Sequence, residues 1–284
     1  MENAKLEKIL SKVDSFPSMP AAGSKLLCLL EEQDVSISEV EDILRYDPGL
    51  TANVLKLANS AYFGIPSRIG SVKQAIILLG TNRLIQLVTA SCVGAVMKKA
   101  VPGYNIPAGN LWRHSIAVSI AAEALVKDKK NLNSEDFFTP ALLHDVGKLV
   151  LGNFVKEDLN AIESITDKGI PFVVAENMIL GADHTEIGAR ILSHWSFPDD
   201  VVNAVRYHHD PESAETSSMK IDVVHLSNLL CQMNSTAPNG AGQAVELSPA
   251  VIDRLGIDLS QFEGISEKVS DWVEEVSSVL TLNE

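Results

Sequence analysis

Apolar residues recur at the helical spacing of three and four residues along almost the whole of this chain. Leu26, Leu27 and Leu30 are one example, and no segment keeps the alternation of a strand for long. Helix boundaries are also encoded in the sequence. Residues 36–39 have the pattern of a capping box, and Gly80 stands where a helix would end. Because the helical period and the helix boundaries agree, we predict an all-α fold.

The spacing of apolar residues and the helix boundary signals also predict where the helices lie, and the composition sets residues 1–233 apart from a C-terminal segment. We predict helices at residues 4–13, 20–32, 38–46, 49–59, 72–79, 82–99, 109–128, 135–154, 157–168, 171–180, 184–195, 199–208 and 220–233. Residues 234–247 are rich in small and turn-forming residues, and we interpret them as a linker or surface loop. Residues 248–284 are acidic. Their apolar positions suit one amphipathic helix: Ile265, Val269, Trp272, Val273, Val276 and Leu280. We expect this stripe to dock on the body of the chain, or otherwise on a partner.

Charge is unevenly distributed along the chain. There are 37 acidic and 23 basic residues, and the formal net charge of -14 disfavours nucleic-acid binding because phosphates would be repelled. Yet no acidic residue occurs between Pro48 and Ala122. The basic residues inside that span are Lys56, Arg68, Lys73, Arg83, Lys98, Lys99 and Arg113. Either much of the span is buried, or it forms a surface for an acidic partner such as the C-terminal segment.

Nothing in the sequence indicates a membrane span. The longest weakly polar run, Leu84–Met97, is shorter than the about 18 apolar residues that a spanning helix needs, and the N-terminus is charged. The three cysteines, Cys28, Cys92 and Cys231, are odd in number and far apart, which favours buried thiols in a reducing compartment. We therefore expect a soluble, cytoplasmic protein.

Histidine is the residue that points to chemistry. Five of the seven histidines occur in a pattern that suggests a metal site, and one of them is followed directly by an aspartate. These residues are His114, His144 with Asp145, His184, His208 and His209. A lone histidine in an apolar helix is usually a core residue, but several of them beside a carboxylate can converge on one cation. Imidazole and carboxylate ligands suit iron, manganese, zinc or nickel rather than calcium.

Two residues next to the His-Asp pair favour a site for an anionic ligand. Gly147 allows another backbone to approach closely, and Lys148 lies one turn from His144 and can attract a phosphate. We interpret Lys148 as a candidate phosphate contact.

In order and type, these residues resemble the HD superfamily of metal-dependent phosphohydrolases. The N-terminal half is similar to one branch, the HD-related output domain or HDOD, which is a bacterial signalling module. The elements LANSAYFG (residues 57–64) and AIILLG (residues 75–80) carry that likeness, which runs from about residue 10 to about residue 231. The resemblance implies an N-terminal helical subdomain at 1–105 packed on an HD-type subdomain at 106–233. Within LANSAYFG, we interpret Asn59 and Ser60 as residues that close a helix.

The resemblance also implies two ligand sets. The first ligand set is His114, His144 and Asp145, and the second ligand set is Asp145, His184, His208 and His209. HD enzymes close the first site with an aspartate, and the matching residue here is Asn228, a weak replacement because an amide carries no charge. Asp222 could substitute only if its helix shifted. His225 shares a helix face with Asn228 and could line the site, although it matches no position of the motif.

The likeness leaves three functions open. We favour a signalling output module that holds one or two divalent ions, iron or manganese before zinc or nickel, and acts through a regulatory protein partner rather than as an efficient hydrolase. The second reading is a metal-dependent phosphohydrolase acting on a nucleotide or other phosphoester. The third is a metal-free interaction scaffold. The Gly-Tyr-Pro element of the related cyclic dinucleotide phosphodiesterases is absent after His209. The sequence does not decide whether the protein binds a phosphate-containing ligand or forms a homo-oligomer. We expect it to bind neither nucleic acid nor a membrane.

Overall fold

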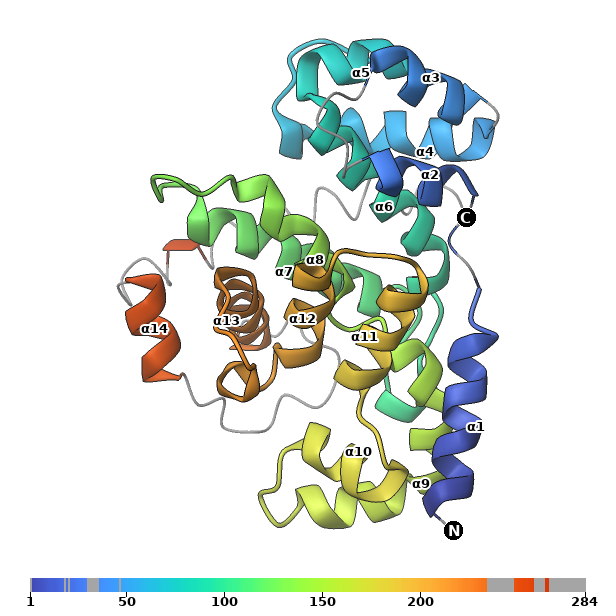
Figure 1. Ribbon diagram of the computed structural model, residues 1–284, viewed down its shortest axis with the longest axis vertical. Helices are drawn as coiled ribbons and strands as arrows, with labels where there is room; N and C mark the ends of the chain where they lie inside the picture. Colours follow the sequence, from blue (N-terminus) through green and yellow to red (C-terminus); the bar gives the residue numbers. More distant parts are fainter. Residues whose placement is uncertain are drawn as a thin grey trace. The chain divides into compact units, whose positions relative to one another are not determined.

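The computed structural model describes residues 2–17, 19, 21–29, 36–45, 47–233, 248–257 and 264–265 (Figure 1). Within these ranges the regular structure is helical, apart from one isolated bridge between Val101 and Ile106. The predicted all-α fold is confirmed. The predicted linker at 234–247 lies outside the described residues, as do the apolar positions of the predicted C-terminal helix beyond Ile265. The short helix α14 (Pro249–Leu255) precedes them.

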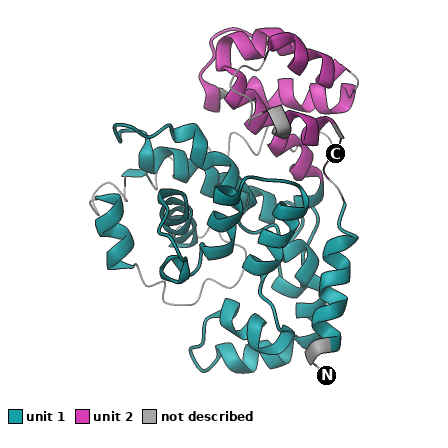
Figure 2. Ribbon diagram, viewed as in Figure 1, with its two compact units in different colours: residues 1–17, 96–269 teal, residues 18–95, 270–284 magenta. Residues whose placement is uncertain are grey.

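The chain divides into two compact units (Figure 2). Unit 1 contains residues 1–17 and 96–269, and unit 2 contains residues 18–95 and 270–284. The domain boundaries expected near residues 105 and 233 stay predictions.

Unit 2 is a small helical bundle with an aliphatic core. Its helices are α2 (Ala21–Leu29), α3 (Ile37–Arg45), α4 (Pro48–Ala58), η1 (Ala61–Phe63), α5 (Val72–Leu79) and all but the last two residues of α6 (Thr81–Met97). Helix α3 packs against α2, α4 and α5, and it buries Val40 and Leu44 completely. These two residues are spaced by one helical turn, which is why the sequence period predicts this face.

Local hydrogen bonds begin and end these helices where the sequence predicts. The Ser36 hydroxyl accepts from the Glu39 amide at 3.2 Å, and the Glu39 carboxylate accepts from the Ser36 amide at 3.1 Å, which completes the capping box. The side-chain amide of Asn59 follows α4, where it donates to the Ile69 carbonyl and accepts from the Ile69 amide. Asn59 therefore ends a helix and fastens the loop that follows.

Unit 1 is built around a buried central helix, α7 (Asn110–Val126). Its elements are α1 (Glu2–Asp14), η2 (Pro102–Tyr104), α7 (Asn110–Val126), η3 (Ser134–Phe137), α8 (Phe138–Leu143), α9 (Lys148–Thr166), α10 (Phe172–Leu180), α11 (His184–His194), α12 (Asp199–Tyr207), η4 (Pro211–Ser213), α13 (Met219–Met233) and α14. Helix α7 is buried on nearly all sides and packs against α8 and α13. Helices α11 and α12 pack against each other, and α12 also packs against α8 and α13.

The predicted helices at 135–154 and 157–168 are wrong in their boundaries. Helix α8 ends at Leu143, a turn occupies residues 144–147, and α9 then runs without a break from Lys148 to Thr166. Hydrogen bonds between residues three apart form the turn. For example, the Lys148 amide donates to the Asp145 carbonyl at 3.0 Å. The predicted break at residues 155 and 156 does not occur, because both residues lie inside α9.

The segment without acidic residues, from Pro48 to Ala122, contains both buried helices and exposed basic side chains. Much of α6 and nearly all of α7 is buried. Five of its basic side chains are exposed, and they are Arg68, Lys73, Lys98, Lys99 and Arg113. The first two belong to unit 2 and the other three to unit 1. Their role as a surface for an acidic partner stays a prediction.

No helix in the described ranges has both the length and the apolar character needed to cross a bilayer. The cysteines whose side chains are described are free thiols. Cys231 is buried as predicted, whereas Cys92 is only partly buried, and the side chain of Cys28 lies outside the described part of the chain.

Candidate metal centre

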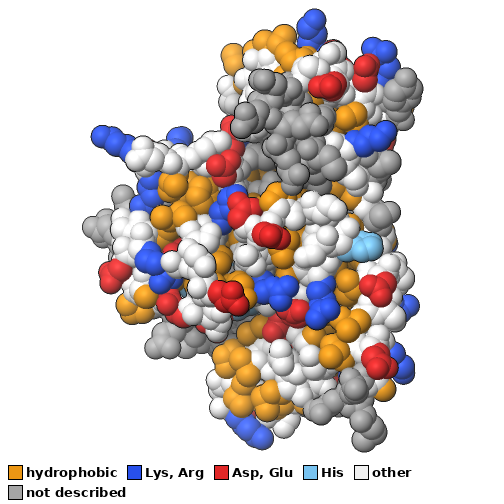
Figure 3. Space-filling model, in the orientation of Figure 1, with side chains coloured by type: hydrophobic (Ala, Val, Ile, Leu, Met, Phe, Trp, Pro, Cys, Tyr) orange, Lys and Arg blue, Asp and Glu red, His pale blue; other side chains and the backbone are white. Residues whose placement is uncertain are grey.

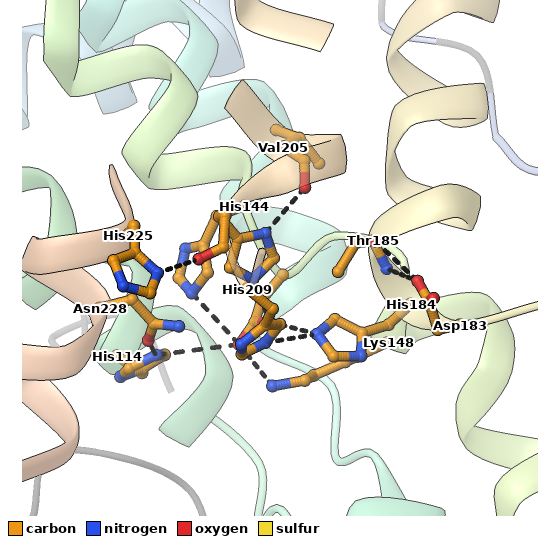
Figure 4. A network of polar contacts seen from close by, with 12 residues as sticks. His114, His144, Lys148, Asp183, His184, Thr185, Val205, His209, His225 and Asn228 are labelled. Carbon is orange, nitrogen blue, oxygen red and sulfur yellow. Dashed lines mark hydrogen bonds and ion pairs between the residues drawn. The ribbon is translucent and has the colours of Figure 1, made fainter. Parts of the chain in front are cut away.

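The structure brings the sequence-predicted site residues together in unit 1 (Figure 4). His114 comes from α7, and His144 and Asp145 come from the turn between α8 and α9. The other residues are Lys148 in the first turn of α9, His184 at the start of α11, His208 and His209 directly after α12, and Asn228 in α13. Asp145 is fully buried at the centre of this arrangement. The interpretation of separate helices converging on one carboxylate therefore fits the observed geometry.

Close backbone packing lets the turn at 144–147 approach α11. A Cβ atom on Gly147 would lie only 1.9 Å from the His184 carbonyl oxygen and 2.7 Å from the Gly188 nitrogen, so only glycine fits there. Asp183 fixes the start of α11, because its carboxylate accepts from the amides of Thr185 and Glu186 at 2.9 and 3.0 Å. His184, the first residue of α11, is held against the turn by these two features.

The first ligand set lies on one side of Asp145. Nε2 of His144 is 3.4 Å from Asp145 Oδ2, and Nε2 of His114 is 3.8 Å from the same oxygen. The same nitrogen of His114, Nε2, lies 3.1 Å from Asn228 Oδ1 and donates a hydrogen bond to it. Asn228 therefore lies beside the first ligand set, and its match to the closing aspartate of HD enzymes stays a prediction.

The second ligand set lies around the other oxygen of Asp145. Nε2 of His184 is 3.5 Å from Asp145 Oδ1, and Nε2 of His208 is 4.0 Å from it. Nε2 of His209 lies 3.1 Å from Nε2 of His184. Ligand atoms of the first set lie within 4.8 Å of one another, and so do those of the second.

Asp222 does not take part in this centre. It is buried, and Arg254 of α14 donates to both of its oxygens, from Nε at 2.8 Å and from Nη2 at 2.7 Å. His225 is also buried near the centre and donates from Nδ1 to the His208 carbonyl at 2.8 Å. His225 thus holds the backbone of one candidate ligand.

Hydrogen bonds at Nδ1 fix the tautomers of three candidate ligands. His144 donates from Nδ1 to the Ala141 carbonyl and His208 to the Val205 carbonyl, each at 2.7 Å. His184 donates from Nδ1 to a carboxylate oxygen of Glu176, also at 2.7 Å. A neutral imidazole that carries its proton on Nδ1 leaves a lone pair on Nε2. All three lone pairs therefore face Asp145.

Unsatisfied buried atoms at this centre fit a cation. Within the described part of the chain, His144 Nε2, His208 Nε2 and Asp145 Oδ1 are buried without a hydrogen-bond partner. Leaving such atoms unpaired costs about 1 to 3 kcal/mol each, and more for a charged group. Imidazole nitrogens and a carboxylate oxygen are the ligands that transition-metal ions take in proteins. The cluster therefore suits a divalent metal site, with the number of ions and their identity left open.

Electrostatics favours the ionised form of Asp145 and the neutral forms of His114, His208 and His209. Burial disfavours the charged form of Asp145, but Lys148 Nζ at 2.7 Å and His144 outweigh it, so the pKa of Asp145 is well below its usual range. Burial and the neighbouring His144 lower the pKa of His114 to about 3. Burial and adjacent imidazoles also lower the pKa of His208 and of His209. Neutral imidazoles and an anionic carboxylate are the forms that bind metal.

We expect the metal-free protein to lose stability as the pH falls below about 6.5. Unfolded histidines bind protons near that pH, whereas His114 stays neutral in the folded protein until about pH 3, so acid favours the unfolded state across this window. Each such histidine adds a slope of at most about 1.4 kcal/mol per pH unit. The low pKa of Asp145 acts in the same direction, but only below about pH 4.

Urea unfolding of the metal-free protein at several pH values tests this expectation. His114→Gln should flatten the pH dependence of the unfolding free energy, because it removes the contribution of one histidine with a lowered pKa. An equal slope in wild type and in His114→Gln would contradict the prediction.

Sequence reasoning missed two residues of this site. Glu176 of α10 is fully buried and binds His184, and Tyr104 of η2 is buried with its ring edge-on to the His184 ring, the centroids 6.3 Å apart. Burial and the Glu176 carboxylate raise the pKa of Tyr104. Glu176 follows a run of apolar residues on a helix, which was a weak signal, because a charged residue there usually faces solvent.

Fold and site together define an all-α protein with a buried histidine and aspartate centre of the HD type. The family model of the HDOD domain matches residues 16–211, more than half of the chain, and the protein belongs to the HDOD family. The match ends before α13, so Asn228 lies beyond it.

Relatives and solved structures agree with this assignment. An uncharacterized protein of Treponema pallidum is 26% identical over 226 residues, 78% of this chain and 43% of that protein. The chain spans less than half the length of the curated relatives it matches. An HDOD domain protein of unknown function from Geobacter sulfurreducens has a TM-score of 0.78 at 26% identity and covers 98% of this chain and 97% of its own. A candidate phosphohydrolase from Shewanella amazonensis has a TM-score of 0.73 at 27% identity, covering 96% and 98%.

Proposed function

We propose that this protein is a cytoplasmic signal-transduction output module that holds a divalent metal in the second ligand set and is not an efficient hydrolase. The observation that carries the proposal is Asn228, whose amide oxygen lies 3.1 Å from His114 Nε2. An amide there adds no negative charge to the first ligand set. Iron and manganese fit these ligands first, followed by zinc and nickel.

The two ligand sets differ in how well they are prepared for an ion. In the second ligand set, His184 and His208 already present Nε2 lone pairs, because their protons are held on Nδ1. In the first ligand set, His114 donates from Nε2 to Asn228, so binding an ion there requires that hydrogen bond to break and the proton to leave Nε2. In the second ligand set His209 must likewise release the proton that it donates from Nε2 to His184 Nε2, but His184, His208 and Asp145 are ready without it. The first ion is therefore held more weakly than the second.

Weak binding of the first ion limits hydrolysis. If both ligand sets held an ion, the pair would supply activation of a water molecule and stabilisation of the leaving oxygen. Here Asp145 is the carboxylate common to both sets, and Lys148 at 2.7 Å adds a positive charge that opposes the binding of a second cation. Lys148 can still attract the phosphate of a ligand, which gives binding without efficient turnover.

A regulatory protein partner is part of the proposal. Val174 and Met178 of α10 are one turn apart and 43% and 54% exposed. Figure 3 shows apolar side chains gathered over the part of this face where α9 and α10 lie. Exposed apolar residues at such spacing favour contact with a protein.

A metal-dependent phosphohydrolase is the second candidate. The contact of Lys148 with Asp145 favours it, because a lysine beside a metal-binding aspartate is well placed to hold a phosphoester. The similar protein from Shewanella amazonensis carries the name of a candidate phosphohydrolase.

Metal content and turnover of the wild type distinguish the candidates. The protein is produced without affinity resin or chelator, its metals are counted by mass spectrometry, and it is assayed on phosphoesters with added manganese or iron. We expect about one firmly held ion per chain and turnover below about 1 per second. Two firmly held ions with faster turnover would make it an enzyme, and a protein that binds no metal would be an interaction scaffold.

A further inference from the structure

Glu176 is a buried carboxylate bound to a candidate metal ligand. It lies on α10 with none of its surface exposed. One oxygen, Oε2, accepts two hydrogen bonds from His184, from the backbone amide at 3.0 Å and from Nδ1 at 2.7 Å. Within the described residues, its other oxygen makes no hydrogen bond of normal geometry, although the buried Tyr104 hydroxyl interacts with the Glu176 side chain. Since burying a carboxylate is costly, the position calls for a role beyond packing.

The partner of His184 differs in charge from the partners of the equivalent histidines. His144 and His208 donate from Nδ1 to neutral carbonyl groups three residues earlier in their own segments. His184 is the first residue of α11, so the chain three residues before it is a loop and not a helix. Glu176 supplies the acceptor instead and brings a negative charge to one ligand of the second set.

We propose that Glu176 is a positioning residue that holds the His184 proton on Nδ1 and makes the second ligand set the tighter of the two. A carboxylate that accepts from Nδ1 fixes the imidazole tautomer and makes Nε2 a more basic ligand. Its charge also attracts a divalent cation across the ring. The part of this inference that concerns the tighter ligand set rests on the proposed metal binding. The part that concerns the His184 tautomer does not.

The surroundings of the pair strengthen this effect. The buried Tyr104 ring lies edge-on to the His184 ring, and it packs against the Phe172 ring with centroids 5.6 Å apart. Gly103 lets η2, which carries the neighbouring Tyr104, pack closely on α9, because a Cβ atom there would lie 2.0 Å from the Gly152 carbonyl oxygen. Buried surroundings screen charges poorly, so the carboxylate acts strongly on His184.

A purely structural role would predict different behaviour, and two variants separate the roles. Glu176→Gln keeps an oxygen that can accept from both nitrogens of His184, but it removes the charge. Glu176→Ala removes the oxygen as well. If Glu176 only ties α10 to α11, the glutamine variant should match the wild type in every respect. The matched control is Glu157→Gln, at an exposed position of α9.

The first measurement is the affinity of the full-length protein for manganese or zinc, obtained by competition with a chelator. We expect the affinity of the tight site to fall about tenfold in Glu176→Gln and up to about a hundredfold in Glu176→Ala. Thermal unfolding of the metal-free Glu176→Gln should resemble that of the wild type. Wild-type affinity in Glu176→Gln would overturn the role of the charge.

The second measurement is the protonation of His184 in the metal-free protein, read from its two ring nitrogens by ¹⁵N NMR at a pH where the ring is neutral. We expect the proton on Nδ1 in the wild type and in Glu176→Gln, and a mixture of tautomers in Glu176→Ala. If the alanine variant keeps the wild-type tautomer, Glu176 is not a positioning residue. A wild type that binds no metal would contradict the proposed function, while the tautomer would still decide the role of Glu176.

Discussion

Asp145→Asn is expected to abolish metal binding at both ligand sets. Asp145 is the residue that the two sets share, and one of its oxygens faces each set. Removing a unit charge a few ångströms from a divalent cation weakens the attraction by at least about 4 kcal/mol, or about a thousandfold in affinity. Metal counting after gel filtration, together with titration of the metal-free protein, measures the loss.

The fold of this variant should survive. Asparagine has nearly the same volume as aspartate, and Lys148 is partly exposed, so its ammonium can turn to water once the carboxylate is gone. Asp199→Asn, at an exposed position in the first turn of α12, is the matched control and should keep wild-type metal content. An Asp145→Asn protein that folds and keeps one ion at wild-type affinity would show that the two sets do not depend on this carboxylate.

Asn228→Asp is expected to have the opposite effect on the first ligand set. The new carboxylate would lie where the amide oxygen now lies, 3.1 Å from His114 Nε2, and would add a negative ligand beside His144 and Asp145. We expect the first ion to bind at least about tenfold more tightly, and metal content to approach two ions per chain. With both ions held, turnover of a phosphodiester should rise by at least about tenfold.

Asn228→Ala is the control for this gain. It removes the hydrogen bond to His114 without adding a charge, so it should raise neither metal content nor turnover. Metal stoichiometry and initial rates with added manganese, measured in parallel on the three proteins, give the comparison. Equal activity in wild type and Asn228→Asp would mean that the neutral amide is not what limits hydrolysis.

Local interactions explain why much of the fold was predictable from the sequence. The reciprocal hydrogen bonds of Ser36 and Glu39 join residues three apart, and Val40 and Leu44 share a face because they are one turn apart. Such patterns extend over a few residues, so they can be read along the chain. The five histidines and Asp145 were also singled out from the sequence, because histidines in this number beside an aspartate are rare in a core. Their division into two ligand sets came from the resemblance to the HD superfamily.

The break at residues 144–147 could not be read in the same way. The segment continues a helical apolar period, yet the chain turns because Gly147 packs directly against the backbone of α11, far along the sequence. Asp222 is a similar case. It was one candidate for the missing carboxylate, and the structure shows it bound by Arg254 of α14 instead.

The sequence by itself determined the helical fold class, the caps that begin and end its helices and the candidate ligands. Tertiary structure alone decided which atoms of those ligands face one another. Glu176 and His184 are eight residues apart on two different helices, and their contact depends on how α10 and α11 pack. The proton positions on His144, His184 and His208 depend on such contacts too. The physical reason is that helix periodicity arises from neighbours along the chain, whereas the centre is made by buried polar groups from separate helices that satisfy one another only once those helices have packed.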